Sequence, residues 1–185
     1  HDTPFMPSTF EPRVEPLRAV GAAHERDERI KRLAGKIDRV LVDAPCSGLG
    51  TLRRNPDLKW RHGPQAIAEL AEKQRRILEA ASQLVRPGGR LVYATCSILQ
   101  EENETVADAF GAGHAEFEPL SCAELLAAQR IALDTGERLR LWPHRHGTDG
   151  FFAAASSLAA SSSTSGSGAG GEAGHQDRQR LTRSP

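Results

Sequence analysis

The stretch Arg39-Val-Leu-Val-Asp-Ala-Pro-Cys-Ser-Gly48 decides the fold of this chain, together with a second stretch, Arg90-Leu-Val-Tyr-Ala-Thr-Cys-Ser97. Each begins with a short apolar run that is typical of a β-strand. In the first stretch, Pro45 and Gly48 prevent the strand from continuing. The apolar residues do not alternate with polar ones, which indicates strands that are buried on both faces of a sheet.

The segment between these two strands has the pattern of a helix. Residues 65–85 carry apolar side chains at helical spacing, Pro64 suits a first helical turn, and Arg86-Pro-Gly-Gly89 ends the helix. Two further helices are expected at residues 101–110 and 123–129. Strands at residues 138–142 and 150–154 form a terminal β-hairpin. This order predicts an α/β fold with a parallel, doubly wound sheet.

The composition divides the chain into three parts and excludes several classes of protein. Among 185 residues, 24 Lys and Arg balance 24 Asp and Glu, which excludes a basic field over the whole protein. No run is long enough for a membrane span, and three widely spaced cysteines favour a reducing compartment, the cytoplasm. We expect a Pro-rich irregular segment at 1–16, a compact region at 17–155 and a flexible Ser/Gly/Ala-rich tail at 156–185.

Two cysteines follow the two core strands directly. Ligands bind outside the carboxyl ends of strands in open α/β sheets, so Cys46 and Cys96 would face one crevice if their strands are neighbours. Asp43 would place a carboxylate in the same crevice. A thiolate that attacks a conjugated ring, with a carboxylate that binds an exocyclic amine, suits such a site. The alternative is that the cysteines are inert, buried residues, and this is the preferred interpretation for Cys122.

These motifs resemble those of the RNA (cytosine-5)-methyltransferases of the Sun/Fmu (RsmB-like) family, which modify ribosomal and transfer RNA. The resemblance rests on Asp43-Ala-Pro-Cys-Ser-Gly48 paired with Ala94-Thr-Cys-Ser97. It extends over residues 37–155 and includes the segments Arg53-Arg-Asn-Pro-Asp-Leu-Lys-Trp60, Pro87-Gly-Gly89, Glu101-Glu-Asn103 and Asp149-Gly-Phe-Phe152. It implies the second half of a Rossmann-like catalytic domain that uses S-adenosylmethionine.

The resemblance also implies a role for each residue of the site. The Cys96 thiolate would add to carbon 6 of cytosine, and carbon 5 would then accept the methyl group. Cys46 corresponds to the cysteine that helps to break this adduct. Asp43 would contact the cytosine edge beside the cofactor, and Pro45 would keep the loop rigid. DNA (cytosine-5)-methyltransferases attack with a Pro-Cys thiol, here Cys46, but the Thr-Cys-Ser motif favours Cys96.

A local basic segment offers a contact surface for RNA. Residues 53–61 have a net charge of +3, and the candidate contacts are Arg53, Arg54, Lys59, Trp60 and Arg61. Basic side chains bind phosphate, and Trp60 can stack on an unpaired base. The alternative is a solvated loop with Trp60 packed on the core.

Residues 101–137 have a net charge of −8 and should avoid RNA. Arg138, Arg140 and Arg145 either extend the basic side or solvate strand edges.

Other types of catalytic site are not favoured by the sequence. His144 and His146 have no Cys or acidic partner at ligand spacing, so a role in a turn is preferred and no metal is expected. Ser47 and Ser97 lack the Gly-x-Ser-x-Gly motif of hydrolases.

The Gly-rich loop that should cradle the cofactor is not found among the 42 residues before Asp43. We therefore expect a partial catalytic domain, whose cofactor loop comes from a missing segment or from a complementary chain. The alternative function is that of a catalytically inactive fragment, which at most binds RNA weakly.

Overall fold

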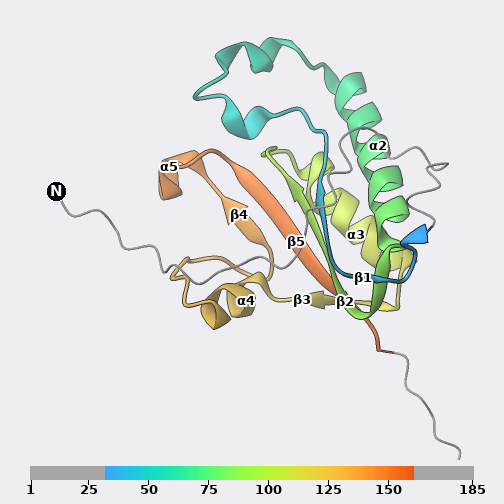
Figure 1. Cartoon of the computed structure of the whole chain (residues 1–185). Coiled ribbons are helices and arrows are strands. Elements are labelled where there is room, and N and C mark those ends of the chain that lie inside the picture. The colour runs from blue at the N-terminus through green and yellow to red at the C-terminus, as the bar shows by residue number, and fades with distance from the viewer. Residues whose placement is uncertain (1–31, 161–185) are drawn as a thin grey trace, which may run out of the picture.

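The computed structural model describes residues 32–160, which form one mixed sheet with helices packed against it (Figure 1). The elements are, in chain order, β1 (Ile37–Asp43), η1 (Leu49–Thr51), η2 (Pro56–Trp60), α2 (Pro64–Ser82), β2 (Val85–Thr95), η3 (Gln100–Glu102), α3 (Glu104–Gly113), β3 (Phe117–Leu120), α4 (Cys122–Ala128), β4 (Leu139–Leu141), α5 (Pro143–His146) and β5 (Phe151–Leu158).

The sheet has the strand order β1-β2-β5-β3, and β4 also pairs with β5. Strands β1 and β2 are parallel, with Asp43 opposite Ala94. Strand β5 is antiparallel to β2, and both β3 and β4 are antiparallel to β5. Strands β1, β2 and β3 therefore run in the same direction, and β5 lies between β2 and β3 in the opposite direction. The carboxyl ends of β1 and β2 consequently meet at the same end of the sheet.

Helices α2 and α3 cover one face of this sheet (Figure 1). The buried residues of α2 are Ala71, Gln74, Leu78 and Ser82, which lie three or four residues apart and therefore share one side of the helix. They face a core that includes Val42 of β1 and Leu91 and Tyr93 of β2. On the opposite side of β1, Leu41 remains 69% exposed.

The structure confirms the α/β class, the helix between the two core strands and the terminal hairpin of β4 and β5. Strands β1 and β2 are parallel, as predicted, but the sheet is not parallel throughout, because β5 runs antiparallel to both β2 and β3. Strand β3, a four-residue strand that contains Pro119, was not predicted from the sequence. A proline in so short a segment hides the strand pattern.

Three predicted boundaries also need correction. Val85 and residues 86–89 belong to β2 rather than to the end of the preceding helix. The predicted helix at 101–110 is divided at Asn103 into η3 and α3. The predicted tail begins too early, because Ser156 and Ser157 pair with Leu91 and Arg90 inside β5. The predicted irregular segment at 1–16 and the tail beyond residue 160 lie outside the described residues.

Candidate active site

The ends of β1 and β2 bring the two cysteines together, as the sequence predicted. The Sγ atoms of Cys46 and Cys96 lie 3.4 Å apart, although the two residues are 50 positions apart in the chain. The parallel register places the last residue of β1 beside the end of β2, and the N–H of Ala44 extends the ladder by donating to the Ala94 carbonyl at 2.9 Å. Each thiol therefore emerges at the carboxyl edge of the sheet, and both are partly exposed.

The contact between the thiols separates their pKa values. The hydrogen bond from Cys46 lowers the pKa of Cys96 to about 7, against the effects of burial and of the charges on Asp43 and Glu102. The same hydrogen bond, together with burial and the negative charge of Cys96, raises the pKa of Cys46 far above its ordinary value. Cys96 is therefore the thiol that ionises first, and Cys46 retains its proton beside it.

Two glycines allow the loop after β1 to lie directly against the loop after β2 and against the segment before β5. The N–H of Gly50 donates to the Cys96 carbonyl at 2.9 Å, and the N–H of Gly150 donates to the Gly50 carbonyl at 2.8 Å. A Cβ atom on Gly50 would lie 2.2 Å from the Gly150 oxygen and 2.7 Å from the Cys96 oxygen. Only glycine fits this backbone contact.

Asp43 and Pro45 lie on the exposed rim of the same site. Asp43 is the last residue of β1 and is exposed, and its charge acts on Cys96. Pro45 is also exposed, but its carbonyl accepts a hydrogen bond of 2.9 Å from Nε2 of Gln74 in α2. That carbonyl is therefore held by the helix beneath the loop.

A buried carboxylate that was not predicted from the sequence joins the two cysteine loops. Glu102 has no exposed surface. Its Oε2 accepts hydrogen bonds of 2.5 Å from Oγ of both Ser47 and Ser97, and its Oε1 accepts from the Ser47 N–H at 2.8 Å. Gln74 donates to the same Oε1 at 3.1 Å. Ser47 and Ser97, which follow the two cysteines, therefore both donate hydrogen bonds to one buried carboxylate.

The basic segment at 53–61 passes over the carboxyl end of the sheet, where it leads from β1 to α2 (Figure 1). Arg54 forms an ion pair with Asp149, and this pair raises the pKa of Arg54. Arg53 reaches the Gly147 carbonyl at 3.4 Å, so the segment is attached to the turn before β5.

Trp60 does not pack on the core. It is 80% exposed, and Nζ of Lys59 lies 4.7 Å from the centre of its ring. The alternative interpretation of a core tryptophan was therefore wrong. Arg61 pairs with Asp57 at 2.5 Å on the surface. An exposed aromatic ring is accessible for stacking on a base, and a basic side chain beside it can bind phosphate.

Two of the arginines that could extend the basic surface form ion pairs with acidic residues of α3. Arg138 pairs with Asp108, and Arg140 pairs with Glu104. These contacts with α3 offset their charges. His146 is the last residue of the four-residue helix α5, and its Nδ1 accepts a hydrogen bond from the Trp142 N–H at 2.9 Å. The sequence predicted a turn for His144 and His146, and the structure instead places both in this short helix between β4 and β5.

A family model described as 16S rRNA methyltransferase RsmB/F matches residues 19–157. The chain belongs to this family. It is 47% identical over 118 residues to the probable ribosomal RNA small subunit methyltransferase B of Bacillus subtilis, covering 63% of this chain and 26% of the relative. The enzyme named ribosomal RNA small subunit methyltransferase B of Shewanella oneidensis is 43% identical over 117 residues, with coverage of 63% and 26%.

A solved structure of NSun6 from Pyrococcus horikoshii with SFG, an analogue of S-adenosylmethionine, superimposes with a TM-score of 0.56 at 30% identity. The match covers 70% of this chain and 32% of that chain. The chain thus spans about a quarter of the length of the curated RsmB relatives. The expected membership of the Sun/Fmu family and the Rossmann-like fold are confirmed.

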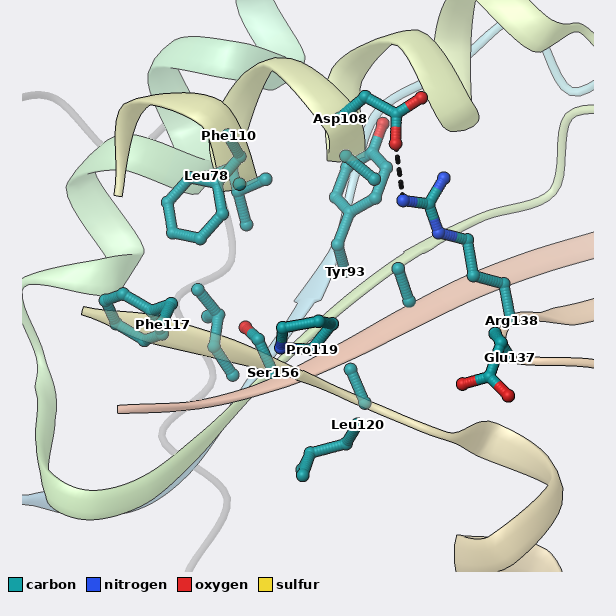
Figure 2. A pocket seen from close by; sticks show the side chains of 15 residues that line it. Leu78, Tyr93, Asp108, Phe110, Phe117, Pro119, Leu120, Glu137, Arg138 and Ser156 are labelled. Carbon is teal, nitrogen blue, oxygen red and sulfur yellow. Dashed lines mark hydrogen bonds and ion pairs between the residues drawn. The ribbon is translucent and has the colours of Figure 1, made fainter. Parts of the chain in front are cut away.

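A separate apolar pocket of about 470 Å³ lies between α3 and the sheet of this RsmB/F chain (Figure 2). Leu78, Tyr93, Phe110 and Phe117 line it, and the Asp108–Arg138 pair spans one side. Neither Cys46 nor Cys96 lines this pocket, so it is distinct from the cysteine site.

Within residues 32–160, no cluster of three or more potential ligands could hold a metal, and no helix is long and apolar enough to cross a membrane.

Proposed function

We propose that this chain supplies the reacting residues for S-adenosylmethionine-dependent methylation of carbon 5 of cytosine in RNA, with ribosomal RNA as the substrate. The observation that carries the proposal is the 3.4 Å contact between Cys46 and Cys96, with the thiolate on Cys96. A low-pKa thiol beside a protonated one is the pair that nucleophilic attack followed by acid–base steps requires. The match to the RsmB/F family and the names of the relatives support an RNA methyltransferase.

In the proposed reaction, the Cys96 thiolate adds to carbon 6 of the cytosine ring. The ring electrons then make carbon 5 nucleophilic, and carbon 5 takes the methyl group that S-adenosylmethionine supplies. Removal of the proton from carbon 5 returns its electron pair to the ring. The bond between carbon 6 and Sγ breaks, and Cys96 leaves as a thiolate. The thiolate of Cys96 and the double bond between carbons 5 and 6 are therefore both restored, and the net change is the replacement of one proton by a methyl group.

Cys46 is proposed to act in the second half of this sequence. While Cys96 is a thiolate, its negative charge and its hydrogen bond keep the proton on Cys46. When Cys96 becomes a neutral thioether on carbon 6, both influences are lost and the pKa of Cys46 falls. Cys46 can then give its proton to water, and its thiolate accepts the proton that leaves carbon 5, so that the bond between carbon 6 and Cys96 breaks and the product is released.

The residues described fit one part of a cofactor site. Asp43 offers an exposed carboxylate at the end of β1, beside Cys96, and its charge is complementary to a cationic sulfonium. We propose that Asp43 binds both the cytosine edge and the rim of the cofactor, and that Pro45 keeps its loop rigid. We further propose that the Gly-rich cofactor loop lies outside residues 32–160, in another segment or in a complementary chain.

We propose that RNA reaches the cysteines along the segment at 53–61. Its phosphate contacts are Arg53, Arg54, Lys59 and Arg61, and its stacking residue is Trp60. This segment begins three residues after Gly50, which contacts Cys96 directly. RNA bound to the segment is therefore guided toward the two thiols.

RNA that contains 5-azacytosine tests the covalent step without a methyl donor, because a ring nitrogen at position 5 makes carbon 6 more electrophilic. We expect the protein to form an adduct that survives denaturing electrophoresis. Cys96→Ala should abolish the adduct, whereas Cys122→Ala is the matched control, because its thiol lies in α4. RNA binding without an adduct in the wild-type protein would instead support the alternative of a catalytically inactive RNA-binding fragment.

A further inference from the structure

The buried carboxylate of Glu102 holds the backbone on both sides of the two reacting cysteines. We propose that Glu102 is a positioning residue, which fixes the Cys46 and Cys96 loops at reacting distance through Ser47 and Ser97. This inference rests on the proposed function for its purpose, but it is argued from contacts that involve neither RNA nor a methyl donor.

Glu102 binds each loop through the residue that follows its cysteine. Ser47 donates both its N–H at 2.8 Å and its hydroxyl at 2.5 Å, and Ser97 donates its hydroxyl at 2.5 Å. The two hydroxyl oxygens lie 3.3 Å apart because they share Oε2 as the acceptor. A single carboxylate oxygen therefore sets the distance between the two loops.

The residues that precede the cysteines are held by the neighbours of Glu102. The carbonyl of Pro45 accepts from Nε2 of Gln74, which also donates to Glu102. Thr95 donates its hydroxyl at 2.5 Å to Oδ1 of Asn103, and the amide of Asn103 donates to the Ser97 carbonyl at 3.0 Å. Each cysteine is thus flanked on both sides by residues of one buried network, while the thiols themselves remain partly exposed.

The network is rigid because its side chains are buried and their polar groups form hydrogen bonds with one another. Gln74 has no exposed surface, and its two amide protons go to Pro45 and Glu102. Tyr93 is also buried, and its hydroxyl lies 2.5 Å from the Glu102 carbonyl. A carboxylate with four donors around it cannot be replaced by an amide without turning a donor toward Ser47 or Ser97. Such preorganised support is what a reacting pair requires.

Formation of a disulfide between Cys46 and Cys96 measures their separation directly. In a glutathione buffer, the two protein thiols are oxidised to one disulfide while oxidised glutathione is reduced to two glutathione molecules. The ratio at equilibrium gives the effective concentration of the pair. We expect Glu102→Gln to lower this effective concentration at least roughly tenfold, the effect expected from displacement of a positioned group. The control Glu101→Gln removes an exposed neighbouring charge and should stay within about twofold of the wild type.

The pH dependence of Cys96 alkylation separates positioning from a simple charge effect. The charged and titratable groups that act on Cys96 are Cys46, Asp43, Glu102 and the exposed Arg54. If Glu102 only contributes charge, its removal lowers the alkylation midpoint of Cys96. If Glu102 positions the loops, its removal also takes away the hydrogen bond from Cys46, and the midpoint moves up from about 7 toward 9.0. If the alkylation midpoint of Cys96 is lower in Glu102→Gln than in the wild-type protein, the proposal is overturned.

Two milder variants keep the test decisive if Glu102→Gln does not fold. Ser47→Ala and Ser97→Ala each remove one hydroxyl ligand of Glu102, and each should lower the effective concentration. Ser82→Ala is the matched control, because its buried hydroxyl donates only to the Glu79 carbonyl within α2 among the residues described. Unchanged disulfide formation in both loop variants would overturn the proposal. Because the assay uses neither RNA nor S-adenosylmethionine, its result is independent of whether the chain methylates cytosine.

Discussion

The thiols of Cys46 and Cys96 are in hydrogen-bonding contact at 3.4 Å, and this contact makes Cys96 the more acidic of the two. The order of ionisation matters because the thiolate, and not the thiol, is the attacking species. A distance between two side chains thus assigns different chemistry to two residues of the same type.

The first prediction concerns the pH dependence of Cys96. Its alkylation by iodoacetamide, followed by mass spectrometry of the Cys96 peptide, should rise through a midpoint near pH 7 and then reach a plateau, because the pKa is lowered to about 7. In Cys46→Ala the hydrogen bond is lost, so the midpoint should move upward toward 9.0. An unchanged midpoint in Cys46→Ala would show that Cys46 does not stabilise the thiolate.

The second prediction concerns Gly50. Its replacement by alanine places a Cβ atom 2.2 Å from the Gly150 oxygen, so the loop that carries Cys46 must move away from Cys96. We expect Gly50→Ala to cost about 1–3 kcal/mol of stability, the usual range for overpacking. Urea unfolding measures this loss.

A matched control for Gly50 is Gly63→Ala. Gly63 precedes α2 with φ −84°, and nothing lies within 4 Å of an added Cβ atom. Equal stability of the two variants would contradict the close backbone contact at Gly50.

The third prediction concerns Trp60. Its ring is 80% exposed, so Trp60→Ala should leave the unfolding midpoint nearly unchanged. Affinity for single-stranded RNA should fall by about 1–3 kcal/mol if the ring stacks on a base. Fluorescence anisotropy with a labelled oligonucleotide measures this affinity. A variant that loses stability but not affinity would assign Trp60 to the fold instead.

The fourth prediction concerns the basic residues of the same segment. Lys59→Ala should reduce the dependence of RNA affinity on salt by about one released counterion, without a preference for any sequence. Arg138→Ala is the control, because Arg138 pairs with Asp108 of α3. A salt slope that is equally affected by both variants would indicate that RNA does not bind specifically along residues 53–61.

The sequence predicted the part of the site that depends on strand ends. Parallel neighbours bring their carboxyl ends together, so Cys46 and Cys96 could be placed in one crevice from the motifs alone. The place of β5 between β2 and β3 could not be predicted in this way, because a short apolar run does not show which strands will be its neighbours in the sheet. Nor could the exposure of Trp60, which depends on the path of a loop.

Glu102 was missed for a different reason. It lies beside Glu101 in an acidic segment, and a carboxylate in the first turn of a helix is normally read as favourable to the helix dipole. Its burial follows only from tertiary packing against Gln74 and the two serines. The signal available in the sequence was the polar Gln74 on the apolar side of a helix, because a buried polar residue needs a partner.

The most direct test of the account is to identify which cysteine carries the covalent adduct with RNA. The protein is allowed to react with RNA that contains 5-azacytosine, both are digested, and the peptide that carries the nucleotide is sequenced by mass spectrometry. The account predicts the nucleotide on Cys96 in the wild-type protein and also in Cys46→Ala when the variant reacts above pH 9.0, where its Cys96 is ionised without the hydrogen bond from Cys46. A nucleotide on Cys46, or a loss of the adduct in Cys46→Ala at this pH, would contradict it and reverse the two roles.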